Sequence, residues 1–123
     1  MSKEPQIIEA LFSKLVSANE IVFPEKREPL NAPKLRGIYI IQMANGTVLH
    51  VGNTPRGKEG IYQRLQNHLR GKSSFARSFL EGNGSILRGT HYFKYLEVSD
   101  ARQRALLEAY AIGKLCPKHI GIG

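Results

Sequence analysis

Apolar residues recur at helical spacing in four stretches of the chain. The first lies between residues 5 and 18, where the stripe consists of Ile7, Ile8, Leu11, Phe12, Leu15 and Val16. The second runs from 58 to 70, and the third from 73 or 74 to 80. The last begins after Asp100 and ends near Leu115. Because serine, aspartate and glycine stand where helices start or stop, four helices are predicted.

Two β-rich runs, Gly37–Met43 and Thr47–Gly52, flank the dipeptide Asn45-Gly46. Asparagine and glycine tolerate positive φ, so this order predicts the tight turn of an antiparallel hairpin. A hairpin of this length would make Tyr39 and His50 cross-strand neighbours. Two polar side chains could share a ligand there.

A further strand is predicted over His91–Val98, which is rich in aromatic and β-forming residues. Phe93 and Leu96 would then face opposite sides of a sheet. Residues 81–90 contain three glycines and are expected to form a loop. Residues 19–35 contain three prolines, which predicts an irregular connection over the surface rather than a helix.

With 123 residues and 41% hydrophobic content, the chain has room for one domain with a modest core. Residues 19–35 could instead be a linker, but the preceding segment is too small to fold alone, so we expect a single domain over residues 1–123. No run approaches the roughly 20 apolar residues that cross a bilayer, and no signal-peptide pattern opens the chain. The single cysteine, Cys116, excludes an internal disulfide and a cysteine-rich zinc site. These features predict a cytoplasmic protein.

The chain carries 18 Lys and Arg against 10 Asp and Glu, which gives a net charge of +8 and a pI near 9.9. Such a charge favours a polyanionic partner, and nucleic acid is the first candidate. Between residues 54 and 77 a single acid, Glu59, stands among six basic residues: Arg56, Lys58, Arg64, Arg70, Lys72 and Arg77. This cluster predicts a phosphate track, although a generally basic, solvated surface remains the alternative.

Glu108 lies in the apolar stripe of the last predicted helix, at i, i+3, i+4 and i+7 with Ala111, Ile112 and Leu115. Burying a carboxylate without a partner is costly, so Glu108 must find water, a cation or an opposite charge. Arg104, one turn earlier, could supply an ion pair; a metal ion is the other possibility.

Arg64 and His68 are four residues apart in the helix predicted over 58–70. At about 100° per residue, both lie on the shoulder of its apolar stripe and could point together into a groove beside the sheet. The alternative for His68 is a surface position without a task. For Tyr39, the alternative to a functional role is that of a strand tyrosine packed in a small core.

Five features in the same order resemble the GIY-YIG nuclease family. Gly37-Ile38-Tyr39 is followed, after ten residues, by His50-Val51-Gly52, with His50 where the family usually has its second tyrosine. Arg64, His68 and Glu108 then match the arginine, the histidine one turn later and the metal-binding glutamate of a later helix. The similarity spans residues 36–117.

This resemblance implies an α+β fold: a small three-stranded antiparallel sheet flanked by helices, to which residues 1–35 add an N-terminal helix and a connecting loop. It also implies a divalent-metal-dependent endonuclease that cuts DNA phosphodiester bonds. The catalytic residues would be Tyr39, His50, Arg64, His68 and Glu108. Further nucleic-acid contacts are expected from Arg56, Lys58, Arg70, Lys72, Arg77 and Lys118.

The chemistry of these residue types suits the implied reaction. Glu108 offers a hard oxygen ligand for Mg2+ or Mn2+, and Arg64 offers a fixed fork of donors to a phosphate. By resemblance, Tyr39 activates the attacking water. Because a free tyrosine has a pKa near 10, that role needs help from a neighbouring base, cation or metal-bound water.

Two departures from the family pattern keep an alternative open. One is His50, which could act as a base at neutral pH or mark a weakened site. The other is the missing asparagine after Pro117, where Lys118 or His119 would have to contact phosphate. The chain could therefore be a catalytically silent nucleic-acid-binding module, or a small interaction protein with incidental charge. The sequence leaves open whether the substrate is DNA or RNA and which sequence or structure is preferred. It also leaves open the oligomeric state, and a dimer is one of the possibilities.

Overall fold

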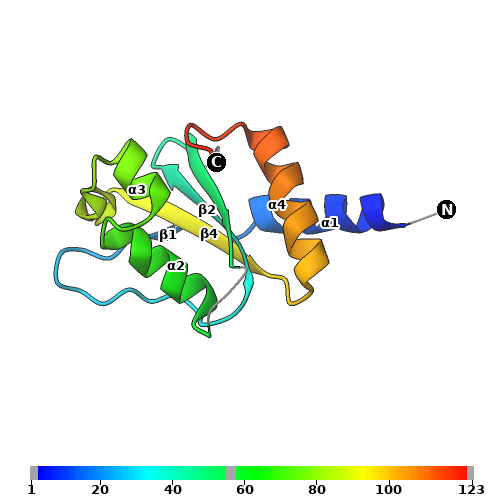
Figure 1. The fold of residues 1–123 in the computed structure, drawn as a ribbon, viewed down its shortest axis with the longest axis horizontal. Coiled ribbons are helices and arrows are strands. Elements are labelled where there is room, and N and C mark those ends of the chain that lie inside the picture. Colours follow the sequence, from blue (N-terminus) through cyan, green and yellow to red (C-terminus); the bar gives the residue numbers. More distant parts are fainter. Residues whose placement is uncertain (1–2, 55–57, 122–123) are drawn as a thin grey trace.

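A computed structural model of the chain describes residues 3–54 and 58–121. It has an α+β fold in which one antiparallel sheet carries helices on both faces (Figure 1). The strands are β1 (Ile21–Val22), β2 (Gly37–Met43), β3 (Val48–Asn53) and β4 (His91–Glu97). The helices are α1 (Glu4–Val16), α2 (Gly60–Leu69), α3 (Ser74–Phe79), the 3-10 turn η1 (Gly84–Leu87) and α4 (Ala101–Leu115).

The sheet has four strands in the order β1-β4-β2-β3, so the expectation of three strands is wrong. The additional strand is β1, which pairs Ile21 with Phe93 and Val22 with Tyr92 of β4. A strand of two residues is too short to produce an alternating pattern, and Pro24 follows it closely. The sequence of this region therefore indicates only an irregular connection.

The predicted hairpin is present, and it contains a β-bulge in β3. Ile41 pairs with His50 and the next residue, Gln42, pairs with Val48, so Leu49 is the extra residue of a β-bulge. Tyr39 consequently stands opposite Gly52, and the prediction that Tyr39 and His50 are cross-strand neighbours is confirmed in a diagonal arrangement. They are diagonal neighbours with ring centroids 6.1 Å apart.

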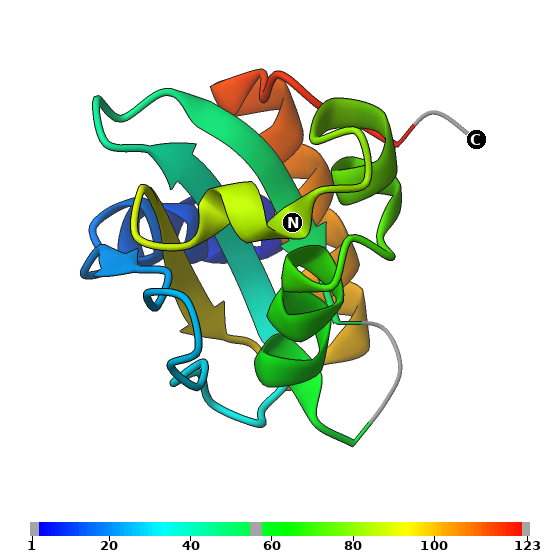
Figure 2. The ribbon, with the colours of Figure 1, turned by 90° about the vertical axis from the view of Figure 1, so that its left-hand side faces the viewer.

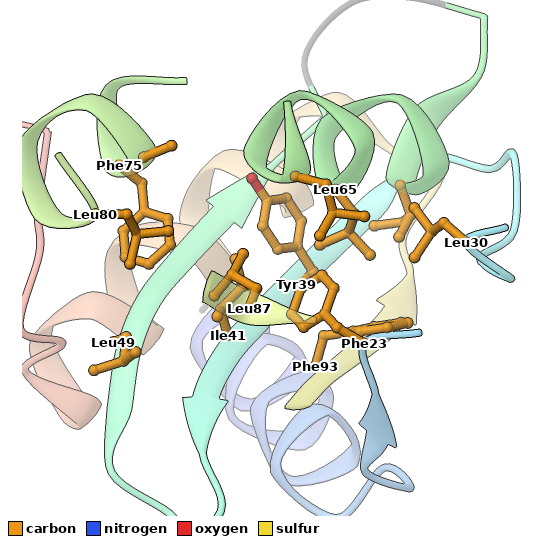
Figure 3. Packing of buried hydrophobic residues seen from close by; sticks show 13 residues of the cluster. Phe23, Leu30, Tyr39, Ile41, Leu49, Leu65, Phe75, Leu80, Leu87 and Phe93 are labelled. Carbon is orange, nitrogen blue, oxygen red and sulfur yellow. The ribbon is translucent and has the colours of Figure 1, made fainter. Parts of the chain in front are cut away.

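The central strand β2 sends alternate side chains into two separate cores. Ile38 and Ile40 enter the core under α1 and α4, called here the α4-side core: Ile8, Leu15, Ile38, Ile40, Val51, Val98, Leu107 and Ala111. Tyr39 and Ile41 enter the core under α2 and α3, called the α2-side core (Figure 3): Phe23, Leu30, Tyr39, Ile41, Leu49, Ile61, Leu65, Leu69, Phe75, Ala76, Leu80, Leu87 and Phe93. The sheet therefore separates the two cores, with α2 and α3 in front of it and α1 and α4 behind it in Figure 2.

The two residues that were predicted to cap helices, Ser73 and Asp100, do so in the structure. Ser73 caps α3 by accepting a hydrogen bond from the backbone N–H of Ala76, and Asp100 caps α4 by accepting from that of Gln103. After α4, Cys116 adopts a left-handed conformation and the chain turns back towards the sheet. In the described part of the chain, no helix is both long and apolar enough to cross a membrane.

Candidate active site

Tyr39 supplies the centre of the candidate site. Its side chain is fully buried, and its hydroxyl points from the sheet towards α2 (Figure 3). The ring lies directly against the backbone of Gly52, where a Cβ atom would come within 2.1 Å of the tyrosine Cζ. Gly52 is therefore needed for close approach of the phenol to β3.

A chain of hydrogen bonds runs from Tyr39 into α3. The Tyr39 hydroxyl lies 2.7 Å from Nε2 of His68, and Nδ1 of His68 lies 2.6 Å from Oγ of Ser73. Oγ of Ser73 also accepts a hydrogen bond from the backbone N–H of Ala76, at 3.0 Å. One hydroxyl group therefore caps α3 and holds the ring of His68. His68 is only 1% exposed, which excludes the alternative of a surface residue without contacts.

His50 occupies the border of the same site. The β-bulge turns both Leu49 and His50 towards the α2-side core, where the His50 ring stacks on Phe75 with centroids 4.9 Å apart. Its ring centroid lies 5.2 Å from that of His68. On its other side, Nδ1 of His50 is 3.2 Å from Nδ1 of His119.

Arg64 and Glu108 complete the set from α2 and α4. Arg64 interacts with Tyr39 through charge and a hydrogen bond, and its charge also acts on Glu108. The half-buried Glu108 accepts a 3.4 Å hydrogen bond from Nδ2 of Asn53. Arg104 donates instead to the carbonyl of Val98, at 2.9 Å, and the described residues contain no Arg104–Glu108 ion pair. The predicted alternative partner for Glu108 is therefore wrong.

Burial controls the protonation of the site. It raises the pKa of Tyr39 to about 12, although the Arg64 charge opposes the shift. Burial, with the nearby His119 and Arg64, lowers the pKa of His50 to about 4, and burial also lowers the pKa of His68 well below its usual value. At neutral pH the phenol thus keeps its proton and both imidazoles are uncharged.

The residues beside Glu108 fit a hard divalent cation. Oδ1 of Asn53 is buried without a hydrogen-bond partner, next to the Glu108 carboxylate that Nδ2 contacts. Oxygen atoms of this kind suit Mg2+ or Mn2+, and Mg2+ commonly keeps waters beside one or two carboxylates. The described residues contain no group of three or more His, Cys, Asp or Glu that could enclose a metal. The site therefore fits an ion that shares its coordination with water and substrate.

The basic residues predicted to bind nucleic acid are spread around this site rather than within it. Lys58 and Arg70 line a polar groove of about 500 Å3 along α2, together with Glu59, Tyr62 and three amide side chains. Three further residues are exposed: Lys72, Arg77 and Lys118. Arg56 lies outside the described residues.

Sequence reasoning did not assign Asn53 and Ser73 to the site, and it named His119 only as a phosphate contact. Asn53 directly follows the His50-Val51-Gly52 signature, which is a signal that could have been used. Ser73 was identified only as a helix cap. Its contact with His68 depends on how the turn at Gly71 folds α3 back onto α2, where Gly71 has φ of 74°.

The comparisons with known proteins identify the family and the fold. Residues 35–120 match the family model of the GIY-YIG catalytic domain. The fold is similar to the GIY-YIG N-terminal endonuclease domain of UvrC from Thermotoga maritima, a crystal structure of that domain bound to its catalytic divalent cation, magnesium. The TM-score is 0.52 at 19% identity, over 92% of this chain and 98% of that chain, so the likeness shows the fold. No curated protein matches the chain.

Proposed function

The chain belongs to the GIY-YIG family, and from this premise we propose that it is a divalent-metal-dependent endonuclease that hydrolyses DNA phosphodiester bonds. The observation that supports the proposal is the meeting of the five expected residues around one site: Tyr39, His50, Arg64, His68 and Glu108. They come from β2, β3, α2 and α4, so only the folded chain assembles them.

Tyr39 orients the attacking water. His68 accepts the hydrogen bond of the phenol through Nε2, which leaves the lone pairs of the Tyr39 oxygen for Arg64 and for water. Ser73 holds the opposite nitrogen of His68 and thereby fixes the ring. Positioning of this kind reduces the entropy that the water loses on reaching the transition state.

Arg64 and Glu108 handle the charge of the phosphate. Arg64 donates to the phosphoryl oxygens, whose negative charge grows during attack. Glu108 would hold Mg2+, or Mn2+ in its place, and the amide oxygen of Asn53 lies beside it. When bound, such an ion would supply polarisation of the phosphate and charge neutralisation at the departing oxygen.

Five exposed basic residues would bind the rest of the DNA through its phosphates: Lys58, Arg70, Lys72, Arg77 and Lys118. The same role is proposed for Arg56 from the sequence alone. We further propose that residues 1–123 act as one domain in the cytoplasm. A bare domain of this size would have limited sequence specificity unless it dimerises or has a partner.

The experiment that tests this function incubates the purified chain with supercoiled plasmid and with branched DNA, in Mg2+, in Mn2+ and in EDTA. The proposal expects cutting in both metals and none in EDTA. The Arg64→Ala variant should cut at least about 10²-fold more slowly, since one preorganised donor contributes this much. An exposed basic residue on another face, Lys14, gives the charge-matched control as Lys14→Ala.

A second candidate function is a silent nucleic-acid-binding module on the same scaffold. The protonated phenol of Tyr39 favours it, because burial keeps the pKa of this residue at about 12 and opposes direct use of the phenolate as a base. DNA binding with a steep salt dependence, and no cutting in either metal, would select this candidate. Absence of DNA binding at low salt would reject both.

A further inference from the structure

The two positions at which the chain departs from its family's pattern meet in space. His50 stands in place of the second tyrosine, and His119 lies just after Pro117, where the family often has an asparagine. Their Nδ1 atoms are 3.2 Å apart and their ring centroids 5.2 Å apart, although 69 positions separate them in the sequence. Two departures that contact each other suggest one joint role.

The backbone fixes His119 in this position. Its N–H donates to the carbonyl of Leu49 at 2.9 Å, and the N–H of Lys118 donates to the carbonyl of Val48 at 3.2 Å. Two backbone hydrogen bonds therefore hold the segment after α4 against the free edge of β3. The red segment in Figure 2 runs beside α3, and the His119 ring lies 5.5 Å from that of Phe75.

The His50 ring is held on several sides. Phe75 stacks on one face at an interplanar angle of 22°, and His119 contacts the ring through its own Nδ1 and through its backbone. The charged and titratable groups that face His50 are His68 and Arg64 from α2, Tyr39 from β2 and His119 itself. The ring thus has one orientation at the border of the site.

Resting on the proposed nuclease function, we infer that His119 is a positioning residue which holds the proton of His50 on Nδ1, so that Nε2 of His50 accepts the proton of the attacking water. The contact atom on His50 is Nδ1, which lies 3.2 Å from Nδ1 of His119, so one of these two nitrogens donates a hydrogen bond and the other accepts it. A proton on Nδ1 leaves Nε2 as the free acceptor.

The chemical step balances with this assignment. The water oxygen forms a bond to phosphorus, and the bond between phosphorus and the 3′ oxygen breaks. One water proton moves to Nε2 of His50, and the departing oxygen takes a proton from solvent. His50 later returns its proton to solvent. Tyr39 needs no phenolate for this step, because it orients the water and keeps its own proton.

A double-mutant cycle tests the inference through activity. His119→Ala should lower kcat for metal-dependent cutting about 10- to 100-fold and leave KM within about twofold, because general base catalysis contributes on this scale. His119→Asn, whose amide can accept from Nδ1, should recover part of that loss. In a His50→Tyr background, the same His119→Ala change should cost less than about twofold. Ile120→Ala is the matched control in the same segment and should behave as wild type.

Equal losses from His119→Ala in both backgrounds would overturn the inference, as would a loss that falls on KM alone. A loss in Ile120→Ala as large as that in His119→Ala would also contradict it, since the segment would then act only through its packing.

Nitrogen-15 NMR of the histidine rings tests the tautomer without any need for activity. The wild-type protein should carry the His50 proton on Nδ1, and His119→Ala should move a substantial fraction to Nε2. A wild-type His50 protonated on Nε2, or a tautomer unchanged by His119→Ala, would contradict the inference. If the wild-type chain does not cut DNA, the nuclease proposal fails, while this spectrum still decides whether His119 sets the His50 tautomer.

Discussion

The sheet separates two cores of similar construction and different chemistry. The α4-side core contains mostly aliphatic side chains, and the charged Arg104 at its border donates to the carbonyls of Val98 and Ser99. The α2-side core instead encloses the phenol of Tyr39 and packs beside the imidazoles of His50 and His68. Both cores receive alternate residues of one strand, β2.

Burying polar groups costs stability unless each finds a partner. The α2-side core meets this cost with the chain from Tyr39 through His68 to Ser73. Among the described residues, four buried side-chain atoms lack a hydrogen-bond partner: Oδ1 of Asn53, Nε of Arg64, Oε1 of Gln66 and Nε of Arg104. Two of them, those of Arg64 and Asn53, belong to the candidate site. Polar groups kept unsatisfied in a folded protein commonly mark a functional site. The α2-side core therefore supplies most of the polar network of the site, and Glu108 with Asn53 completes the site from the α4 side of the sheet.

The strongest way to break the α2-side core selectively is Gly52→Ala. The added Cβ would lie 2.1 Å from Cζ of Tyr39, so the phenol must shift. A displacement near 1 Å in a catalytic group can cost about 10²-fold, and we expect cutting to fall by at least this factor. Gly113→Ala in α4 is the control, because its Cβ meets nothing within 4 Å and it should cut normally. Plasmid cleavage rates measure both; a wild-type rate for Gly52→Ala would contradict the account.

The opposite core is tested by Leu15→Ala in α1. Leu15 is fully buried in the α4-side core, so the free energy of unfolding should fall by about 2–5 kcal/mol. The cutting rate per folded molecule should not change, since the cavity lies across the sheet from Tyr39. Urea denaturation and cleavage assays read out the two effects. Ile7→Ala, exposed on the same helix, should change stability by less than about 0.5 kcal/mol.

Acid should destabilise the α2-side core through its histidines. The pKa of His50 is about 4 in the folded chain and near 6.5 when unfolded, so the unfolded state binds more protons between these values. Stability contributed by the neutral ring is present above pH 6.5 and is lost as the pH falls towards 4. The difference is about 2–3 kcal/mol from His50.

Thermal unfolding between pH 4 and 7 measures this effect in wild type and in His50→Tyr. The variant should lose less stability on acidification. His91→Gln is the control, because His91 is more exposed and its change should alter the pH dependence less. An identical pH dependence of wild type and His50→Tyr would contradict the assignment.

The smallest expected effect comes from Ser73→Ala. This change removes the cap of α3 and the partner of His68 Nδ1, which together should cost about 1–2 kcal/mol. Ser73→Thr keeps a hydroxyl and should recover most of the loss. Ser74→Ala, next to it and exposed, is the control. Denaturant midpoints measure all three; equal stability of Ser73→Ala and Ser74→Ala would remove Ser73 from the network.

Local patterns were sufficient to predict most of the fold. The alternation in His91–Val98 correctly separates Phe93 from Leu96, and Asp100 begins α4 as expected. These signals act over a few residues. The strand β1 was not predicted, because two residues cannot show a period and their pairing partner lies in β4.

The candidate site was predictable in its members and less so in its contacts. The family resemblance names Arg64 and Glu108, and the helical angle of His68 correctly directs it towards the sheet. The bulge at Leu49 and the contact between His50 and His119 depend on strand register and on the return of the chain after α4. Neither leaves a periodic signal in the sequence.

The most direct test of the central claim compares wild type with Glu108→Ala in the plasmid cleavage assay with Mg2+. The account predicts that wild type cuts, that EDTA stops it, and that the variant loses cutting while keeping its DNA affinity and its unfolding temperature. An unchanged cutting rate in Glu108→Ala would contradict the assignment of the metal to Glu108.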